Sequence, residues 1–106
     1  MVKQYDIYWV NLDPTVGSEI QKTRPCLVIS PNFSNKILNT LLVAPITSTL
    51  RKFPMRIQID LQGKTGQVAL DQIRCVDKSR LLKKMDSLDK ESVTNLKEIL
   101  SEYLVE

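Results

Sequence analysis

The feature that most constrains the fold is a series of short apolar runs, each about as long as one β-strand, with turn residues between them. The runs cover residues 5–12, 26–30, 40–46, 55–61, 67–70 and 72–76. In the fourth run, apolar side chains alternate strictly with Arg56, Gln58 and Asp60, which places the apolar set on one face of a strand. Chains with many short strands of this kind form sandwiches or barrels.

The last segment has a different period, because apolar residues recur at helical spacing through residues 93–104. Asp89 is placed to cap this helix, and Glu91 lies in its first turn, where an acidic side chain is favourable. A single helical turn is also predicted within residues 78–84. We therefore predict a mainly β fold, a small barrel with a C-terminal helix, in one domain covering residues 1–106.

The composition excludes several kinds of chemistry. The chain has no histidine, and histidine is the commonest metal ligand and general base. Cys26 and Cys75 lie far apart in apolar runs, so they form neither a disulfide framework nor a metal-binding spacing, and both are expected as buried free thiols. We therefore expect no metal and no cofactor, with any chemistry carried by Arg, Lys, Glu, Asp, Thr, Ser or Tyr.

Charge and hydropathy indicate where the protein acts and what it meets. No uncharged run is long enough to span a bilayer, and residues 1–9 lack the apolar stretch of a signal peptide, so a cytoplasmic protein is expected. Residues 1–84 carry 13 Lys and Arg against 6 Asp and Glu, whereas residues 85–106 carry 2 against 6. A basic body favours a polyanion partner, although a merely solvated surface has the same composition.

A first polar cluster is the segment GSEIQKTRP, residues 17–25, between two apolar runs. Pro25 forces Arg24 into an extended conformation at the root of a buried strand, which makes its guanidinium a preorganised positive charge. Glu19 is close enough in sequence to share the site, and Lys22 and Thr23 lie between them. The alternative is an exposed loop with an incidental ion pair.

A second polar cluster follows the third apolar run. Thr47 and Ser48 come at the strand end, where hydroxyls cap backbone groups or donate to a phosphate. Arg51, Lys52 and Phe53 follow, and basic residues beside an aromatic ring suit single-stranded nucleic acid.

A third candidate is the segment LDQIRCVD, with Asp71 and Gln72. Asp71 either forms an ion pair with Arg74 or accepts hydrogen bonds from a nucleobase. Two aromatic residues outside these clusters, Trp9 and Tyr103, are expected in the core rather than in a site.

Several of these segments together resemble the MazF/PemK toxin family. The resemblance rests on DIYWVNLDPTVGSEIQKTRPCLVIS, then APITS, then DQIRCVDKSRL, in the family's order and spacing from residue 6 to residue 81. It implies an SH3-like barrel of the CcdB/Kid/MazF type that works as a homodimer. It also implies a metal-independent endoribonuclease that cuts single-stranded RNA at short sequences. Such an enzyme is the toxin of a toxin–antitoxin pair, and a MazE-like antitoxin silences it with an acidic, disordered segment.

The resemblance also implies roles for individual residues. Arg24 matches the family's catalytic arginine, Thr47 matches its threonine, and Glu19 matches its glutamate. Asp71 matches an aspartate that takes part in some relatives, but Ala69 stands where those relatives have an arginine. The expected RNA-binding residues are Lys22, Thr23, Ser48, Arg51, Lys52, Phe53, Asp71 and Gln72.

RNA carries its own nucleophile, the 2′-OH, so this set can work without a covalent enzyme intermediate. The products would then carry a 2′,3′-cyclic phosphate and a 5′-OH. The cut sequence is expected to depend on loops at residues 32–39 and 49–55. Two alternatives stay open. One is a gyrase-poisoning toxin of the CcdB type, although such toxins end in Trp-Gly-Ile and this chain ends in Leu-Val-Glu. The other is an RNA-binding module that does not cleave.

Overall fold

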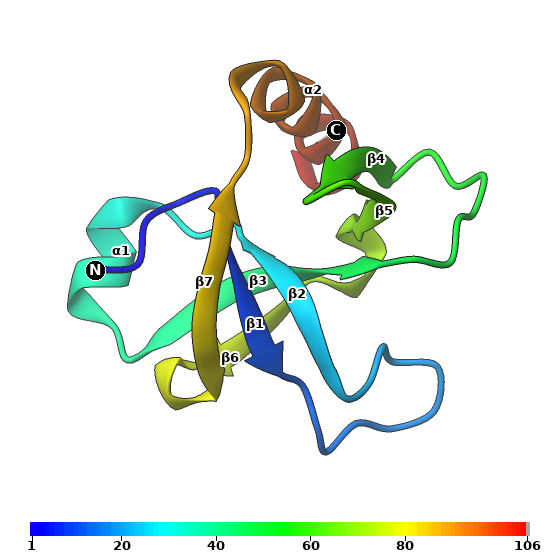
Figure 1. Cartoon of the computed structure of the whole chain (residues 1–106). Coiled ribbons are helices and arrows are strands. Elements are labelled where there is room, and N and C mark those ends of the chain that lie inside the picture. The colour runs from blue at the N-terminus through cyan, green and yellow to red at the C-terminus, as the bar shows by residue number, and fades with distance from the viewer. Residues whose placement is uncertain (106) are drawn as a thin grey trace.

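The computed structural model describes residues 1–105, which form a curled antiparallel sheet with a helix at the C-terminal end (Figure 1). The strands are β1 (Asp6–Asn11), β2 (Thr23–Val28), β3 (Thr40–Thr47), β4 (Arg56–Leu61), β5 (Lys64–Ala69), β6 (Arg74–Asp77) and β7 (Leu81–Ser87). The helices are α1 (Asn32–Ile37) and α2 (Lys90–Leu100), with 3-10 turns at Leu70–Gln72 and Lys78–Arg80 and a π-helical turn at Ser101–Val105.

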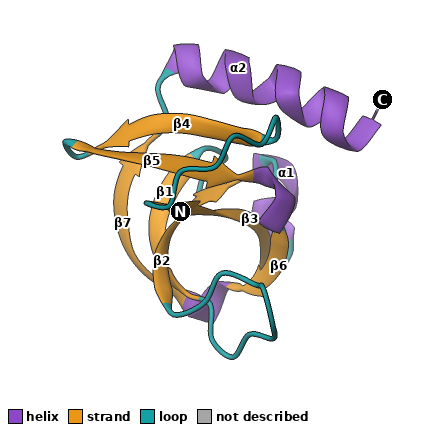
Figure 2. Cartoon of the chain, turned by 90° about the vertical axis from the view of Figure 1, so that its right-hand side faces the viewer, coloured by secondary structure: helices purple, strands orange, loops and turns teal. Residues whose placement is uncertain are grey.

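The curl of the sheet comes from β3, which changes partner along its length. The sheet order is β4-β5-β3-β2-β1-β7, and β6 also pairs with β3. The first half of β3, Thr40 to Val43, pairs with β6, and its last residues, Ile46 and Thr47, pair with β5. Figure 2 shows the strands bending round on themselves, with α2 lying across β4. The predicted small barrel with a C-terminal helix is therefore confirmed as a curled half-barrel.

Alternation along the strands fills two cores, one on each face of the sheet. In β3, Val43 enters one core and the next residue, Ala44, enters the other. The buried residues of one core are Val10, Leu12, Cys26, Val28, Leu41, Val43 and Val76. Those of the other are Ile7, Leu27, Ala44, Ile46, Ile57, Ile59, Leu61, Val68, Leu70 and Leu96. Burial of each large apolar side chain contributes about 1.5–3 kcal/mol, so both faces of the central strands stabilise the fold.

Helix α2 follows the prediction from the sequence. The Asp89 carboxylate accepts a hydrogen bond from the backbone N–H of Ser92, which is the geometry of an N-cap. Leu96 is fully buried in the core that α2 covers. The expectation of core positions for Tyr103 and Trp9 is wrong, since their side chains are 45% and 36% exposed. Tyr103 lies beyond the last residue of α2, and Trp9 opens onto a cleft.

Strand β7 replaces most of the helical turn predicted at residues 78–84, of which only Lys78–Arg80 is helical. It pairs with β1, and the register shifts twice. Its two partly buried side chains pack on different cores, Leu81 on the core that holds Val10 and Met85 on the core that holds Ile7. The structure also corrects two smaller expectations: Cys75 is exposed rather than buried, and part of the loop expected at residues 32–39 is helix α1.

Candidate functional site

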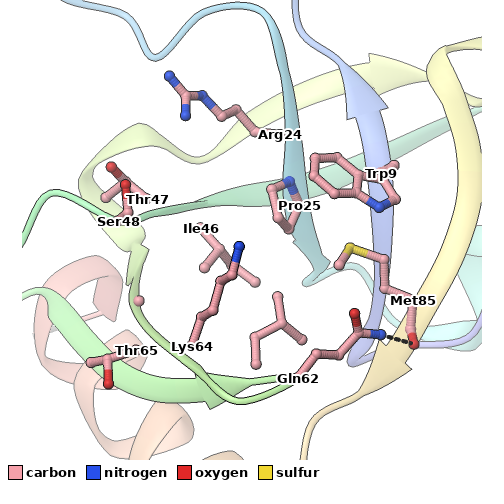
Figure 3. A pocket seen from close by; sticks show the side chains of 12 residues that line it. Trp9, Arg24, Pro25, Ile46, Thr47, Ser48, Gln62, Lys64, Thr65 and Met85 are labelled. Carbon is pink, nitrogen blue, oxygen red and sulfur yellow. Dashed lines mark hydrogen bonds between the residues drawn. The ribbon is translucent and has the colours of Figure 1, made fainter.

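Arg24 lies inside β2 rather than in the loop before it. It pairs with Val10 of β1, so the neighbouring strand fixes its backbone. Its Nε donates a hydrogen bond to the carbonyl oxygen of Gln21 at 3.1 Å, which holds one side of the guanidinium. Figure 3 shows the outer end of the side chain pointing away from the sheet. In residues 1–105, no protein group accepts a hydrogen bond from its two terminal nitrogens.

Thr47 ends β3 on the neighbouring strand. The paired stretch of β2 and β3 ends with Cys26 opposite Pro45, two residues from Arg24 and from Thr47. Thr47 itself pairs with Gln67 of β5. The Thr47 Oγ1 accepts a hydrogen bond from the backbone N–H of Thr49 at 3.1 Å, so the hydroxyl proton is left to donate.

Arg24 and Thr47 stand between two clefts, since both side chains line both. The larger cleft, about 350 Å³, is lined by Trp9, Arg24, Pro25, Ile46, Thr47, Ser48, Leu61, Gln62, Lys64, Thr65, Gly66 and Met85. The smaller cleft, about 270 Å³, is lined by Ser18, Glu19, Ile20, Gln21, Arg24, Thr47, Thr49, Arg51, Arg56 and Gln72. A guanidinium and a hydroxyl with free donors therefore stand where the two clefts adjoin.

Glu19 reaches the smaller cleft from the loop between β1 and β2. Its Oε1 accepts a hydrogen bond from the backbone N–H of Val16 at 2.6 Å. Gln72 holds this loop in place, because its Oε1 accepts from the Ile20 N–H at 3.3 Å and its Nε2 donates to the Ser18 carbonyl at 3.4 Å. The amide of Gln72 thus positions the Glu19 segment beside the cleft.

Asp71 forms an ion pair with Arg56, and not with Arg74 as one of the predictions had it. The two Asp71 oxygens accept from Arg56 Nε at 2.6 Å and from Nη2 at 3.0 Å. This hydrogen bonding holds the pKa of the Asp71 carboxyl below its ordinary value. The Cζ atom of the same guanidinium lies over the Phe53 ring, 5.3 Å from the ring centroid. Arg74 instead donates to the Leu12 carbonyl at 3.0 Å.

Of the other predicted site residues, some line one of the two clefts and others line neither. Ser48 lines the larger cleft and Arg51 the smaller one. Lys22, Thr23 and Lys52 are exposed and line neither.

The structure also places residues at the larger cleft that the sequence analysis missed. They are Trp9, Gln62, Lys64 and Met85. Trp9 was assigned to the core because it alternates within an apolar strand. The other three come together from β5, β7 and the turn between β4 and β5, and no local pattern in the sequence marks them.

The described part of the chain has neither a metal-binding cluster nor a membrane-spanning helix. Between residues 1 and 105, no three His, Cys, Asp or Glu side chains gather in a group that could hold a metal ion. The helices in that range are also too short or too polar to cross a membrane.

A curled half-barrel with a C-terminal helix and a basic, hydroxyl-lined recess defines a class of small β proteins suited to binding a phosphodiester. Comparison with known proteins gives the particular family. The family described as PemK-like, MazF-like toxins of type II toxin–antitoxin systems matches residues 3–104. The chain belongs to this family, whose members are endoribonucleases.

Individual relatives agree with this assignment. The chain is 37% identical to Endoribonuclease EndoA of Bacillus subtilis (strain 168), over 94% of this chain and 91% of that protein. Among solved structures, it is similar to MazF from Deinococcus radiodurans, with a TM-score of 0.85 and 25% identity over 97% and 96% of the two chains. An endoribonuclease from Mycobacterial species, solved with its cognate antitoxin, has the same fold, with a TM-score of 0.83 at 19% identity over 98% and 95%. The resemblance inferred from the sequence is therefore confirmed.

Proposed function

We propose that the chain, acting as one domain, cuts single-stranded RNA without a metal ion, by attack of the RNA's own 2′-OH on the adjacent phosphorus. The observation that carries this proposal is that Arg24 and Thr47 line the same two clefts. They come from the neighbouring strands β2 and β3, and both keep hydrogen-bond donors for a substrate. Such preorganised donors suit the charge that develops on a phosphorane.

The reaction needs the 2′ proton to be removed, the phosphorane to be stabilised and the leaving 5′ oxygen to be protonated. Each of these has a candidate group. The 2′ oxygen bonds to phosphorus, and its proton passes to the carboxylate of Glu19. Arg24 binds the phosphorane, and the Thr47 hydroxyl donates to a non-bridging oxygen. The bond to the 5′ oxygen then breaks, and that oxygen takes up a proton, for which Arg24 is our candidate donor. The products carry a 2′,3′-cyclic phosphate and a 5′-OH.

The position of Glu19 supports its role as general base. Its carboxylate lines the cleft that Arg24 and Thr47 also line, on a loop fixed by the amide of Gln72. A base must reach its proton within hydrogen-bond distance, directly or through one water. Asp71, the other carboxylate considered for the site, is already paired with Arg56, which leaves Glu19 as the better candidate.

The test is to incubate the purified protein with a pool of synthetic RNAs in excess EDTA and to sequence the ends formed. We expect cleavage at a short sequence, with cyclic phosphate on one product and 5′-OH on the other. Cleavage that stops in EDTA and returns with Mg²⁺ would contradict the metal-free mechanism. A gel shift without cleavage would indicate an RNA-binding module instead. Neither cleavage nor a shift would indicate a toxin of the gyrase-poisoning type.

We also propose partners for this activity. The substrate is messenger RNA in the cytoplasm, and the basic body of residues 1–84 favours such a polyanion. Ser48, Arg51 and Gln72, which line the clefts, are the best placed of the expected RNA-binding residues. A cognate antitoxin with an acidic segment is proposed as the inhibitor. Its support is the family's toxin–antitoxin description and the similar fold of the mycobacterial enzyme solved with its antitoxin.

A homodimer is proposed from an exposed apolar stretch at α1 and the start of β3. Phe33, Ile37, Leu38 and Leu42 are 73%, 79%, 51% and 42% exposed. Large exposed apolar side chains close together favour a protein contact, and a two-fold dimer would cover them with the same residues of a second copy. Light scattering should then give twice the chain mass, and Ile37→Glu should shift the protein toward monomer. Monomeric mass for the unaltered protein would refute the dimer.

A further inference from the structure

The larger cleft continues past Arg24 and Thr47 to a far end that the proposed chemistry leaves unused. Figure 3 shows this end, where Trp9, Pro25 and Met85 form an apolar wall. Lys64 lies across the cleft from that wall, and Gln62 lies beside Met85.

Trp9 is held as a rigid, partly exposed aromatic face. Its backbone lies in β1 with Pro25 of β2 opposite on one side and Lys83 of β7 on the other. The side chain is nevertheless 36% exposed and stands beside Pro25, with Met85 close below (Figure 3). An indole fixed between two strands loses little conformational freedom on contact with a ligand, which favours stacking.

The opposite side of the cleft supplies a positive charge, and the turn next to it supplies an amide. The side chain of Lys64, at the start of β5, rises into the cleft (Figure 3). Gln62, in the turn before β5, donates from Nε2 to the Met85 carbonyl at 3.1 Å. This bond ties the β4–β5 hairpin to β7 and fixes the distance between the two walls. An aromatic face, a cation and an amide around a narrow space are the groups that a base and its phosphate need.

We propose that the far end of the larger cleft is a nucleobase subsite. The base of a nucleotide next to the scissile phosphate stacks on Trp9, and Lys64 pairs with the following phosphate. This inference rests on the proposed function, because the subsite adjoins the proposed reaction centre: Arg24 and Thr47 line the same cleft. The whole of the larger cleft has a volume of about 350 Å³, which is at the lower end of the range of about 300–1,000 Å³ for small-molecule sites.

Tryptophan fluorescence tests the subsite directly, because Trp9 is the only tryptophan of the chain. The probe is a 2′-O-methyl RNA oligonucleotide, which has no free 2′-OH to attack. Its sequence is the mapped cut sequence or, where nothing is cut, the sequence that the protein binds most tightly in the RNA pool. We expect the probe to quench the emission of Trp9. Replacement of Trp9 by Leu should weaken its binding about 5- to 100-fold, and Trp9→Phe should keep most of the affinity. Because these variants have no tryptophan, their affinity is measured by the fluorescence anisotropy of a dye-labelled probe. Tyr103→Leu, at another exposed aromatic residue, is the matched control and should have no effect.

An abasic series then separates stacking from a general loss of structure. Removing the base that stacks should weaken binding to the unaltered protein, and should cost the Trp9→Leu variant nothing further. Circular dichroism and thermal unfolding of the variants check that they are folded. Unchanged emission, unchanged affinity of Trp9→Leu, or additive effects of the two changes would overturn the subsite. If Trp9→Leu loses antitoxin binding but keeps its affinity for the oligonucleotide, the subsite is also overturned. The cleft would then bind a side chain of the antitoxin.

The two proposals fail in different ways. If the protein cleaves RNA and Trp9→Leu binds the probe normally, the subsite is wrong and the nuclease proposal stands. If RNA is bound with quenching and the abasic pattern but is never cut, the cleavage mechanism is wrong and the subsite stands.

Discussion

Gln67 holds the backbone of Arg51 through two reciprocal hydrogen bonds. Its Oε1 accepts from the Arg51 N–H and its Nε2 donates to the Arg51 carbonyl, both at 2.9 Å. Gln67 is only 7% exposed and pairs with Thr47 between β5 and β3. One buried amide therefore fixes the segment after β3, which carries Ser48 and Arg51, next to the proposed reaction centre.

Replacing Gln67 by Leu should both destabilise the fold and weaken RNA binding. The change leaves two backbone groups of Arg51 without partners, at a cost of about 1–3 kcal/mol. Because the loop is freed while Arg24 and Thr47 stay in place, we expect KM to rise more than kcat falls. Urea unfolding and steady-state kinetics measure the two effects. Gln58→Leu is the matched control, since Gln58 pairs with Gln67 across β4 and β5 but is exposed, and should change stability by less than about 0.5 kcal/mol. Equal effects of the two variants would contradict the role of Gln67.

Arg24 and Thr47 should be needed for catalysis and not for folding. Arg24→Ala and Thr47→Val each remove a donor aimed at the substrate, so kcat should fall by roughly 10²–10³. Thr47→Ser keeps the hydroxyl and should retain most activity. Arg24→Lys keeps the charge but loses the planar fork of donors, so it should fall between the unaltered protein and Arg24→Ala. Single-turnover cleavage of one RNA measures all four variants. Full activity of Arg24→Ala would refute the assignment.

The ion pair of Asp71 and Arg56 should give stability that acid removes. The folded state lowers the pKa of Asp71, chiefly through its hydrogen bonds from Arg56, so the pair stabilises the fold above the ordinary carboxyl pKa of about 3.9. That contribution is lost as the pH falls through the folded-state pKa. We expect the free energy of unfolding of Asp71→Asn to lie below that of the unaltered protein at pH 6, with the gap closing toward pH 2. Asp60→Asn, on the exposed face of β4, is the control and should show a smaller gap. A gap that does not change with pH would mean that the ionised pair contributes nothing.

The sequence indicated the parts of the site that depend on local rules. Arg24 was a candidate because Pro25 follows it and an apolar strand comes next, and Thr47 because it ends a strand, while their proposed catalytic roles come from the resemblance to the MazF/PemK family. Both constraints act within a few residues of the chain. The half-barrel followed from the short alternating runs for the same reason.

The remainder of the site depends on contacts between distant segments. The partner of Asp71 is Arg56, which lies 15 residues away at the start of β4, and no spacing rule distinguishes it from Arg74. Trp9 was assigned to the core because alternation shows which face a residue takes, but not whether that face is covered. In β1 one face opens onto the larger cleft. Lys64 and Met85 meet there only after the sheet has curled.

Cys26 should be unreactive in the folded protein. It lies fully buried in β2, and burial raises the pKa of its thiol to about 12. At pH 8 the reactive thiolate is then roughly 10⁻⁴ of the total, and reagents have no access to it. In a Cys75→Ser variant, Cys26 is the remaining thiol, so an aromatic disulfide reagent should react only as fast as the protein opens. The same variant in denaturant should react at once with one equivalent. Rapid labelling of the folded variant would mean that β2 opens readily, and a strand that opens readily could not hold Arg24 in the fixed position proposed for catalysis.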